Sequence, residues 1–357
     1  MNLDFYKNKR IFITGHNGFK GSWLCRILLG AGADICGYSL PIEGKDNLFE
    51  LADIKDHIHD INGDIRDYSF LQSTFNDFNP DVVFHLAAQP IVRDSYKDPK
   101  YTYETNVMGT VNILECVRNS DCVRSFLNVT TDKVYKNNEW YWGYRENEEL
   151  NGFDPYSNSK SCSELVTDCY KKSFFSNRDI AISTARAGNV IGGGDFANDR
   201  IIPDCVRAQI DKKIIVVRNP KSIRPYQHVL EAVFAYLLIA ENQYKDISIA
   251  GSYNVGPDDE SCVSTGTLVS LFCDKWGNDA VWETKAELNA PHEANFLKLD
   301  CSKLKRTFGW QPIWNIAEAV QRTCDWTKVW LEHGNIKNEM NTEITDYYEG
   351  MKGNVLE

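Results

Sequence analysis

The sequence has little of what marks a nucleic-acid-binding or membrane-spanning protein. Lys and Arg number 39 against 50 Asp and Glu, for a formal net charge of −11, and no basic block stands out that would follow a phosphate backbone. No apolar stretch approaches the roughly 18 residues needed to cross a bilayer. We therefore expect a cytoplasmic protein with neither a nucleic acid nor a membrane as partner.

The sequence also lacks any pattern that would turn its cysteines into a scaffold. The 11 cysteines are scattered, without a CxxC pair or a Cys/His cluster at zinc spacing. We therefore predict neither disulfides nor a metal. What is present is 43% hydrophobic residues in a chain of 357, enough for one large domain or two smaller domains with cores of their own.

Short apolar runs alternate with helical patterns through the first half of the chain. The runs typical of strands are residues 10–14, 34–38, 81–88, 125–130 and 180–187. Residues 21–31 and 105–118 carry apolar side chains at helical spacing and have the length of crossover helices. This alternation predicts an α/β fold with a doubly wound parallel sheet of the Rossmann type.

The alternation stops after Asn189, where Gly192-Gly193-Gly194 opens a region rich in loops, prolines and aromatics. A predicted helix over 229–240 and a predicted strand over 252–256 would return to the main sheet. We therefore predict two interleaved domains: a dinucleotide-binding domain over 1–188 with a return segment at about 229–256, and a smaller substrate-binding domain mainly over 189–357.

A glycine-rich turn follows the first predicted strand and opens a helix. It reads Gly15-His16-Asn17-Gly18-Phe19-Lys20-Gly21. Glycines allow a sharp turn and a close approach of the backbone to phosphates, while free amides and the helix N-terminus attract negative charge. Because the turn lies between a strand and a helix, it predicts a pyrophosphate site rather than an ordinary turn. Asp64, which follows a later strand, is a candidate contact for an adenine amino group, with a plain charged loop as the alternative.

The end of the second predicted strand decides which dinucleotide to expect. Dinucleotide-binding proteins often place Asp or Glu there to hold the ribose hydroxyls. This sequence instead has Gly37-Tyr38-Ser39-Leu40-Pro41, with no acidic residue and no Arg for an additional ribose phosphate. We therefore predict NAD rather than NADP, bound with modest affinity.

Tyr156 and Lys160 lie four residues apart at the start of a predicted helix, so both side chains lie on one helical face. A phenol beside an ammonium is easier to ionise and can act as a base toward a sugar hydroxyl. Thr131, at the end of the fifth predicted strand, would complete the group by hydrogen bonding to the reacting hydroxyl.

These features together resemble the extended short-chain dehydrogenase/reductase superfamily and, within it, the nucleotide-sugar 4,6-dehydratases. The similarity is greatest to the members that act on CDP-glucose, and it covers nearly the whole chain. Beside the glycine turn, the matching strings are His85-Leu86-Ala87-Ala88-Gln89-Pro90, Asn106-Val107-Met108-Gly109-Thr110, Tyr141-Trp142-Gly143-Tyr144-Arg145-Glu146-Asn147-Glu148, Asp154-Pro155-Tyr156-Ser157-Asn158-Ser159-Lys160, Arg186-Ala187-Gly188-Asn189-Val190-Ile191-Gly192-Gly193-Gly194-Asp195 and Arg218-Asn219-Pro220.

The resemblance implies roles for individual residues. Asp132 would protonate the departing 6-hydroxyl, and Lys133, where many dehydratases have Glu, would remove the proton at carbon 5 as a neutral amine. The implied catalytic set is Thr131, Asp132, Lys133, Tyr156 and Lys160. The implied cofactor contacts are the glycine turn, Asp64, Ile65, Leu86, Ala87, Ala88, Gln89, Thr105, Tyr156 and Lys160. The implied substrate contacts are Arg93, Asn189, Arg200, Arg218 and Arg224; the planar fork of Arg suits a diphosphate.

The implied reaction converts CDP-D-glucose to CDP-4-keto-6-deoxy-D-glucose and water. The resemblance also implies a part in deoxysugar biosynthesis for lipopolysaccharide O-antigen and a homo-oligomeric enzyme, either a dimer or a tetramer. Three alternatives stay open: a dehydratase of another nucleotide hexose, a nucleotide-sugar 4-epimerase and a non-catalytic dinucleotide-binding regulator. An epimerase would have no use for Asp132 and Lys133. The sequence departs from the family pattern at Val134, usually Cys, and at Tyr226, usually Trp.

Overall fold

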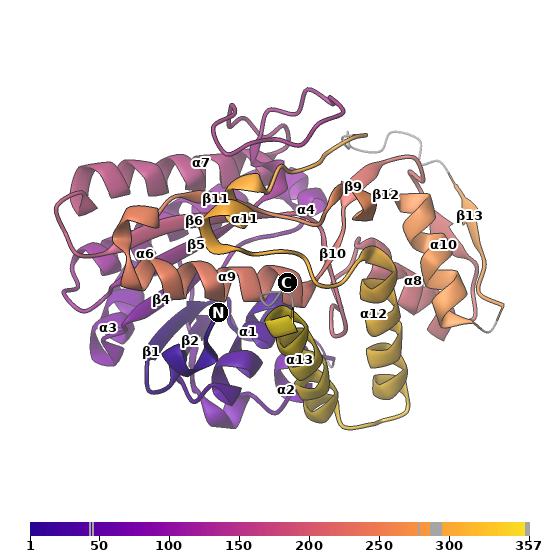
Figure 1. Cartoon of the computed structure of the whole chain (residues 1–357), viewed down its shortest axis with the longest axis horizontal. Helices are drawn as coiled ribbons and strands as arrows, with labels where there is room; N and C mark the ends of the chain where they lie inside the picture. Colours follow the sequence, from indigo (N-terminus) through magenta and orange to yellow (C-terminus); the bar gives the residue numbers. More distant parts are fainter. Residues whose placement is uncertain (43, 45, 278, 286–294, 354–357) are drawn as a thin grey trace.

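A seven-stranded parallel sheet forms the centre of the computed structural model, which describes residues 1–42, 44, 46–277, 279–285 and 295–353 (Figure 1). The strand order is β11-β6-β5-β4-β1-β2-β3, with every neighbouring pair parallel. This is the predicted doubly wound sheet, in which the order reverses beside β1. The strands are β1 (Arg10–Thr14), β2 (Asp34–Ser39), β3 (His59–Asn62), β4 (Val82–His85), β5 (Ser125–Thr131), β6 (Ala181–Ala187) and β11 (Ser252–Val255).

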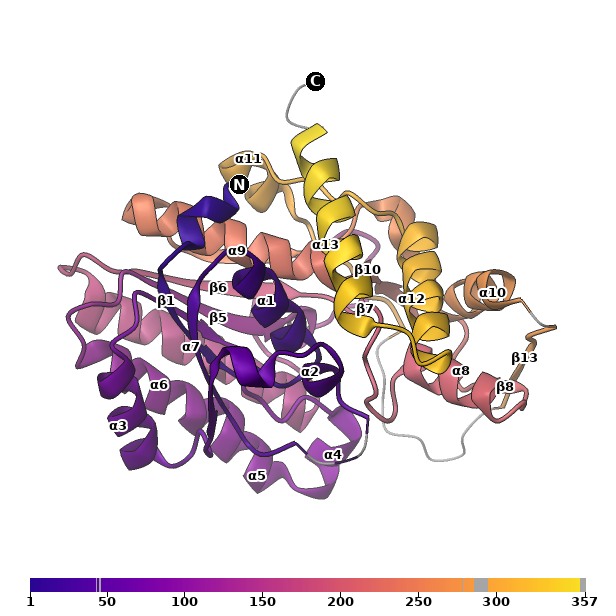
Figure 2. The same cartoon turned by 90° about the horizontal axis from the view of Figure 1, so that it is seen from below.

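Helices cover both faces of the sheet, so its central strands are buried and read as nearly continuous apolar runs. One face carries α3 (Tyr68–Phe78), α6 (Gly109–Arg118) and α7 (Pro155–Tyr170). The other carries α1 (Phe19–Gly30) and α9 (Val229–Lys245), with α11 (Ser302–Phe308) near β11 and α13 (Ile336–Gly353) against α1 (Figure 2). Short elements are α2 (Leu48–Leu51), α4 (Val92–Lys97), α5 (Pro99–Tyr103), η1 (Leu3–Tyr6), η2 (Lys55–His57), η3 (Glu104–Met108), η4 (Asp132–Val134), η5 (Lys171–Phe175), η6 (Ile247–Ile249) and η7 (Asp259–Ser261).

A smaller body lies beside the carboxyl ends of the strands and has an apolar cluster of its own. Its helices are α8 (Ile201–Ile210), α10 (Thr265–Trp276) and α12 (Ile316–Leu331). Three strand pairs tie it together: β7 (Val190–Ile191) with β10 (Gln227–His228), β8 (Ile215–Val217) with β13 (Trp282–Thr284), and β9 (Ile223–Pro225) with β12 (Cys262–Ser264). The chain returns from this body to the main sheet through α9 and β11. The domain limits given above stay a prediction.

Several elements differ from the sequence-based expectation in their bounds, and for one strand and one helix the reason is visible in the structure. The strand expected over 81–88 ends at His85, because the chain leaves the sheet after Leu86 and crosses the glycine turn, where the Ala87 amide donates to Thr14 Oγ1 at 3.2 Å. The helix expected over 105–118 begins as a π-helical turn, Glu104–Met108, before α6. Among the described helices, none is both long and apolar enough to span a membrane.

Candidate active site

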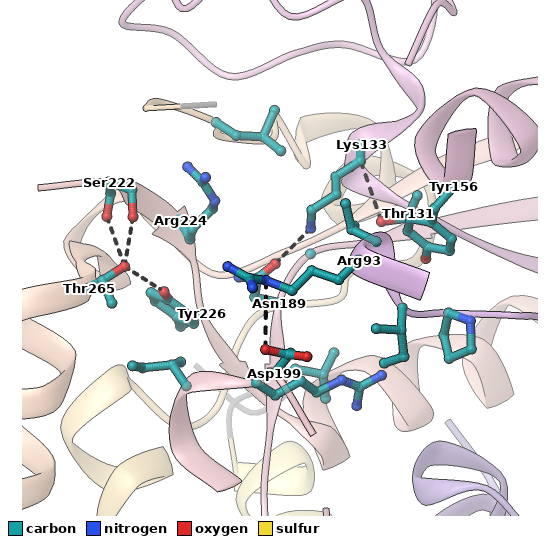
Figure 3. Close-up of a pocket in the computed structure, with 18 of the residues that line it drawn as sticks. Arg93, Thr131, Lys133, Tyr156, Asn189, Asp199, Ser222, Arg224, Tyr226 and Thr265 are labelled. Atoms are coloured by element: carbon teal, nitrogen blue, oxygen red, sulfur yellow. Dashed lines mark hydrogen bonds and ion pairs between the residues drawn. The ribbon is translucent and has the colours of Figure 1, made fainter. Parts of the chain in front are cut away.

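A cavity of about 1070 Å³ opens at the carboxyl ends of β1, β5 and β6, between the sheet and the smaller body (Figure 3). It is lined by Lys20 after β1, by Thr131 and Lys133 at the end of β5, by Tyr156 at the start of α7 and by Asn189 after β6. Ligands of open α/β sheets bind at this edge, near the strand where the order reverses. Residues that are distant in sequence therefore meet because the strands run parallel.

The glycine turn is shaped by close backbone approach at two of its three glycines. Gly15 has φ +75°, and a Cβ there would lie 2.7 Å from the Ala87 nitrogen. A Cβ at Gly21 would lie 2.2 Å from the Gly15 carbonyl oxygen, whereas at Gly18 the nearest atom is 3.5 Å away. The turn thus packs tightly against the protein and leaves open space above Gly18, which fits a pyrophosphate that passes over the helix N-terminus.

Three polar side chains predicted to contact the cofactor instead form hydrogen bonds or ion pairs with other residues of the protein. His16 is fully buried between Ser39 Oγ at 3.0 Å and Asp60 Oδ1 at 2.8 Å. Asn17 donates to the Leu40 carbonyl at 2.8 Å. Arg66 binds the Asp64 carboxylate and holds its pKa below the usual value. The backbone amides of His16 and Asn17 are therefore better placed for a ligand than their side chains.

The other predicted cofactor residues form the wall beside this turn. Leu86, Ala87 and Ala88 follow β4 and pass next to Gly15. Gln89 donates to Thr102 Oγ1 at 3.0 Å, and Ile65 packs against Gly109. The Thr105 hydroxyl is buried without a hydrogen-bond partner among the described residues. A polar atom left in this condition fits a site that a ligand completes.

Asp154 and Pro155 start α7 and thereby place Tyr156 in the cavity. The Asp154 side chain accepts a hydrogen bond from the Ser157 amide, and Pro155 occupies the first helical position. Burial raises the pKa of Tyr156 to about 12, although the hydrogen bond with Thr131 and the charge of Arg200 lower it. Proximity to Lys160 alone, as expected from the sequence, therefore does not make this phenol easy to ionise.

Two lysines near Tyr156 are themselves shifted. Burial lowers the pKa of Lys160 to about 8, opposed by the charge of Glu164, and its ammonium donates to the Val129 carbonyl at 3.2 Å. Burial also lowers the pKa of Lys20 to about 7, and the charge of Arg200 acts in the same direction. Near neutral pH, both cations are thus close to the point at which they lose a proton.

Asp132 and Lys133 lie next to each other on the short turn η4 after β5. Thr131 Oγ1 donates to Asp132 Oδ1 at 3.0 Å, and Lys133 Nζ lies 3.4 Å from the same oxygen. The Lys133 amine also donates to Asn189 Oδ1 at 3.1 Å. The Asp132 side chain is 1% exposed and that of Lys133 is 30% exposed. Asp132 Oδ2 is buried and has no hydrogen-bond partner among the described residues.

The predicted substrate arginines converge on the cavity, and two aspartates that the sequence analysis missed hold three of them. Asp199 lies 3.6 Å from Arg93 and 3.3 Å from Arg218, and Asp195 lies 2.9 Å from Arg200. Arg224 donates to the Ile223 carbonyl at 2.9 Å. Asp195 closes a glycine string and Asp199 precedes Arg200, but nothing in the sequence indicates which arginine each would meet.

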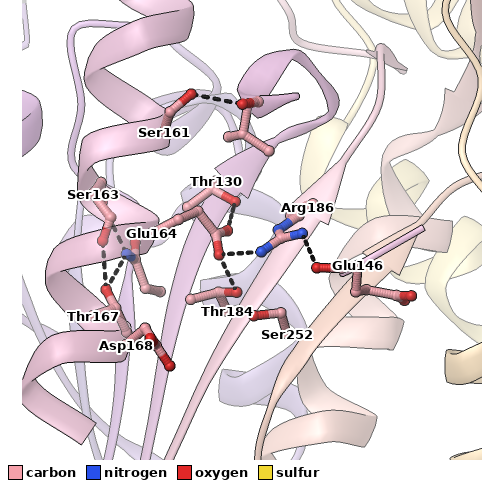
Figure 4. A network of polar contacts seen from close by, with 12 residues as sticks. Thr130, Glu146, Ser161, Ser163, Glu164, Thr167, Asp168, Thr184, Arg186 and Ser252 are labelled. Atoms are coloured by element: carbon pink, nitrogen blue, oxygen red, sulfur yellow. Dashed lines mark hydrogen bonds and ion pairs between the residues drawn. The ribbon is translucent and has the colours of Figure 1, made fainter. Parts of the chain in front are cut away.

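A buried polar network behind α7 was also missed (Figure 4). Glu164 accepts hydrogen bonds from Thr130 at 2.5 Å, Thr184 at 2.7 Å and Arg186 at 2.8 Å. Glu164 and Arg186 are 2% and 3% exposed. The spacing of four from Tyr156 to Lys160 and again to Glu164 is the one signal that would have placed Glu164 on the same face of α7.

The two departures from the family pattern are accommodated locally. Val134 is the last residue of η4 and is fully buried. Tyr226 lines the cavity, and its hydroxyl lies 3.0 Å from Thr265 Oγ1. Among the described residues, no group of three or more His, Cys, Asp or Glu side chains is arranged to hold a metal ion.

Comparison with known proteins identifies relatives along almost the whole chain. The family described as GDP-mannose 4,6 dehydratase matches residues 12–323. A CDP-glucose 4,6-dehydratase of Salmonella typhimurium is 44% identical over 350 residues, which cover 96% of this chain and 97% of the relative. A CDP-paratose 2-epimerase of Salmonella typhi is 27% identical, covering 89% of this chain and 99% of the relative.

Solved structures with the same fold include both epimerases and dehydratases. The Thermotoga maritima UDP-glucose 4-epimerase with UDP-glucose has a TM-score of 0.79 at 21% identity, covering 90% of this chain and 99% of that chain. The Bacillus anthracis dTDP-glucose 4,6-dehydratase in complex with NAD has a TM-score of 0.76 at 21% identity, covering 91% and 98%. At these identities the structures establish the fold. The family match and the 44% identical relative establish more: the chain belongs to the GDP-mannose 4,6 dehydratase family.

Proposed function

We propose that the protein is an NAD-dependent 4,6-dehydratase that converts CDP-D-glucose to CDP-4-keto-6-deoxy-D-glucose and water. The observation that carries the proposal is the meeting of two groups at one cavity: Tyr156 with Thr131 lines it, and so does Lys133, whose amine lies 3.4 Å from the buried Asp132 carboxylate. A 4-epimerase needs only the first group. The 44% identity to a CDP-glucose 4,6-dehydratase supports the choice of substrate.

The first step is the removal of the proton on the 4-hydroxyl by the Tyr156 phenolate. Bound NAD would supply a positively charged ring and the acceptor for the hydride of carbon 4, which it later returns to carbon 6. That ring charge is needed because burial raises the pKa of Tyr156 to about 12. The Lys160 ammonium and the Thr131 hydroxyl stabilise the phenolate and hold it in place.

The second step is the loss of water across carbons 5 and 6. The 4-ketone makes the proton at carbon 5 acidic, and the neutral Lys133 amine takes it. The electron pair of the broken C5–H bond forms the C5=C6 double bond as the C6–O bond breaks. The leaving hydroxyl takes a proton from the Asp132 carboxyl and departs as water. When the hydride is returned to carbon 6, the Lys133 ammonium would give its proton back to carbon 5, which completes the 4-keto-6-deoxy product. Asp132 is buried and its carboxylate lies 3.4 Å from the Lys133 amine, so the proposed acid and the proposed base lie side by side.

The nucleotide diphosphate is assigned to the arginines that surround the cavity. Arg93, Arg200 and Arg218 each lie near an aspartate, which limits the conformations of a flexible side chain before the ligand arrives. Two negative phosphates would compete with Asp195 and Asp199 for the same guanidinium groups. Arg224 is assigned to the same ligand, whereas the side-chain oxygen of Asn189, expected from the sequence to lie near the diphosphate, accepts a hydrogen bond from Lys133 at 3.1 Å.

Mass spectrometry of the product tests the proposal directly. Purified protein with added NAD is incubated with CDP-glucose and, in parallel, with UDP-, GDP- and dTDP-glucose. We expect loss of the mass of water from CDP-glucose, with no net NADH. A product of unchanged mass that separates from the substrate by chromatography would identify an epimerase, and recovery of all four substrates unaltered would favour a non-catalytic dinucleotide-binding protein. A thermal-shift screen with the same sugars ranks their binding, since a ligand stabilises the folded protein.

The predicted homo-oligomer has a candidate contact surface on the outer face of α7. Leu165 on α7 and Met108 on the adjacent η3 are 55% and 50% exposed. Large apolar side chains exposed on neighbouring helices suit a self-association surface. Sedimentation of the wild type and of Leu165→Glu tests this, with a smaller species expected for the variant. The cytoplasmic location and the part in lipopolysaccharide O-antigen synthesis stay predictions.

A further inference from the structure

Lys133 and Asn189 are brought together by the register of two neighbouring strands. In the parallel pair β5 and β6, Thr131 lies opposite Ala187. Lys133 and Asn189 each come two residues after this last pair, so both lie at the same edge of the sheet. Their side chains meet in the cavity, where Lys133 Nζ donates to Asn189 Oδ1 at 3.1 Å (Figure 3).

The two acceptors around the amine constrain its orientation. Lys133 Nζ lies 3.1 Å from the Asn189 amide oxygen and 3.4 Å from the Asp132 carboxylate. A neutral amine has two N–H groups and one lone pair, so it can donate to both oxygens without a third proton. The remaining tetrahedral position then holds the lone pair, on a side chain that lines the cavity and is 30% exposed.

We propose that Asn189 is a positioning residue for the proton transfer at carbon 5, which directs the Lys133 lone pair toward the substrate. This inference rests on the proposed function. Lysine has a flexible four-carbon stem, so one acceptor alone would leave the amine free to turn. Asn189 supplies the second acceptor from a different strand and thereby selects one orientation.

The chemical identity of Asn189 matters as much as its position. An amide oxygen accepts an N–H without carrying a net charge, whereas a carboxylate there would stabilise the ammonium. Charged side chains that line the cavity with Lys133 include Lys20, Lys136, Asp195, Arg200 and Arg224, and the Asp132 carboxylate already lies 3.4 Å from the Lys133 amine. An amide at position 189 thus adds no second negative charge beside an amine that must lose its proton.

The proton balance of the step is consistent with this arrangement. The C5–H proton moves to the Lys133 lone pair, and the electron pair of that bond goes to carbon 5 and then into the C5=C6 bond as the hydroxyl leaves with the Asp132 proton. Lys133 is then an ammonium, and Asp132 is an anion 3.4 Å away. The two donated hydrogen bonds stay in place throughout, because only the third position gains or loses a proton.

The test separates the oxidation from the proton transfer in one experiment. The enzyme with NAD is mixed with CDP-glucose in D2O, and NADH absorbance and deuterium at carbon 5 are followed together. For Asn189→Ala we expect NADH formation close to wild type and exchange at carbon 5 slowed by on the order of tenfold or more, as for other misplaced catalytic groups. For Asn189→Asp we expect slow exchange near neutral pH that recovers as the pH rises.

Each further outcome bears on a different statement. Lys133→Met sets the floor for exchange; if it exchanges at the wild-type rate, the base in the proposed function is wrong and the inference fails with it. If Lys133→Met stops exchange while both Asn189 variants exchange normally, the inference alone is overturned. The same holds if Asn189→Ala slows NADH formation as much as exchange, because Asn189 then acts in substrate binding.

Discussion

The two halves of the cavity differ in how firmly their reactive groups are held. Behind Tyr156, Lys160 donates to the backbone of β5 and lies one turn from Glu164, which accepts three buried hydrogen bonds. In the other half, Lys133 is 30% exposed and Asp132 Oδ2 has no partner among the described residues. In the proposed function, Lys160 must keep its charge and its position, whereas Lys133 must take a proton from the substrate and Asp132 must give one to the leaving hydroxyl. The hydrogen-bond network of Glu164, called the frame below, lies one turn from Lys160, whereas Lys133 and Asp132 have fewer contacts that would oppose a change of protonation.

Breaking the frame should give the largest effect. Glu164→Gln removes the ion-pair partner of the buried Arg186, and we expect it to lower the free energy of unfolding by about 3–5 kcal/mol. Urea denaturation measures this. The matched control is Asp168→Asn, one turn later on α7, which breaks an exposed pair with Lys172 and should cost less than about 1 kcal/mol. Equal losses in the two variants would show that the buried network stabilises the protein no more than an exposed ion pair does.

Removing the phenol oxygen should abolish the oxidation half without touching the frame. We expect Tyr156→Phe to lower turnover by about a hundredfold or more, because the base for the 4-hydroxyl is lost while the ring stays in place. Steady-state kinetics and thermal unfolding measure the two effects separately, and the unfolding temperature should be nearly unchanged. Tyr170→Phe, near the other end of α7, serves as the control. Activity of Tyr156→Phe near that of the wild type would remove this residue from the base role.

Removing the amine should stop the second half while the first still runs. We expect Lys133→Met to form the 4-ketone, seen as a lasting rise in NADH absorbance, and to lose about a hundredfold in the release of water. Lys97→Met, an exposed lysine on α4, should behave as wild type. A variant at position 133 that fails to build up NADH would mean that the two halves do not act independently.

A smaller effect is expected on the pH dependence of NADH formation, the step that depends on Lys160 and Tyr156. Lys160 has a pKa of about 8, so its ammonium loses its proton as the pH rises through that value and its support for the Tyr156 phenolate is lost. NADH formation should therefore decline on the alkaline side. Glu164 raises the pKa of Lys160, so Glu164→Gln should move the decline to lower pH. An unmoved or alkaline-shifted decline in the variant would contradict this assignment.

The smallest expected effect concerns the choice of dinucleotide. Tyr38 is fully buried and donates to the Asp64 carbonyl, and Ser39 lies 3.0 Å from His16, so neither side chain is free to clamp a ribose. We expect faster turnover with NAD than with NADP at equal concentration, and loss of part of the NAD on purification. Better support by NADP would show that the end of β2 has been misread.

Local patterns were sufficient for the parts of the site that lie close together in sequence. The glycine turn is where it was expected between β1 and α1, and Tyr156 and Lys160 share one face of α7. The strand over 81–88 was predicted too long because its apolar residues continue past His85, where they cover Gly15 instead of extending the sheet. The predicted roles of the site residues are for the experiments above to test.

The doubly wound sheet, the glycine turn and the resemblance to nucleotide-sugar dehydratases could be predicted from the amino-acid sequence, because each depends on residues a few positions apart or on long matching strings. Three contacts became visible only in the folded chain: Asp199 lies between Arg93 and Arg218, Glu164 pairs with Arg186, and Asn189 accepts a hydrogen bond from Lys133. These contacts join segments whose separation in sequence carries no signal. They form because parallel strands end at one edge of the sheet, and strand register decides which side chains meet there.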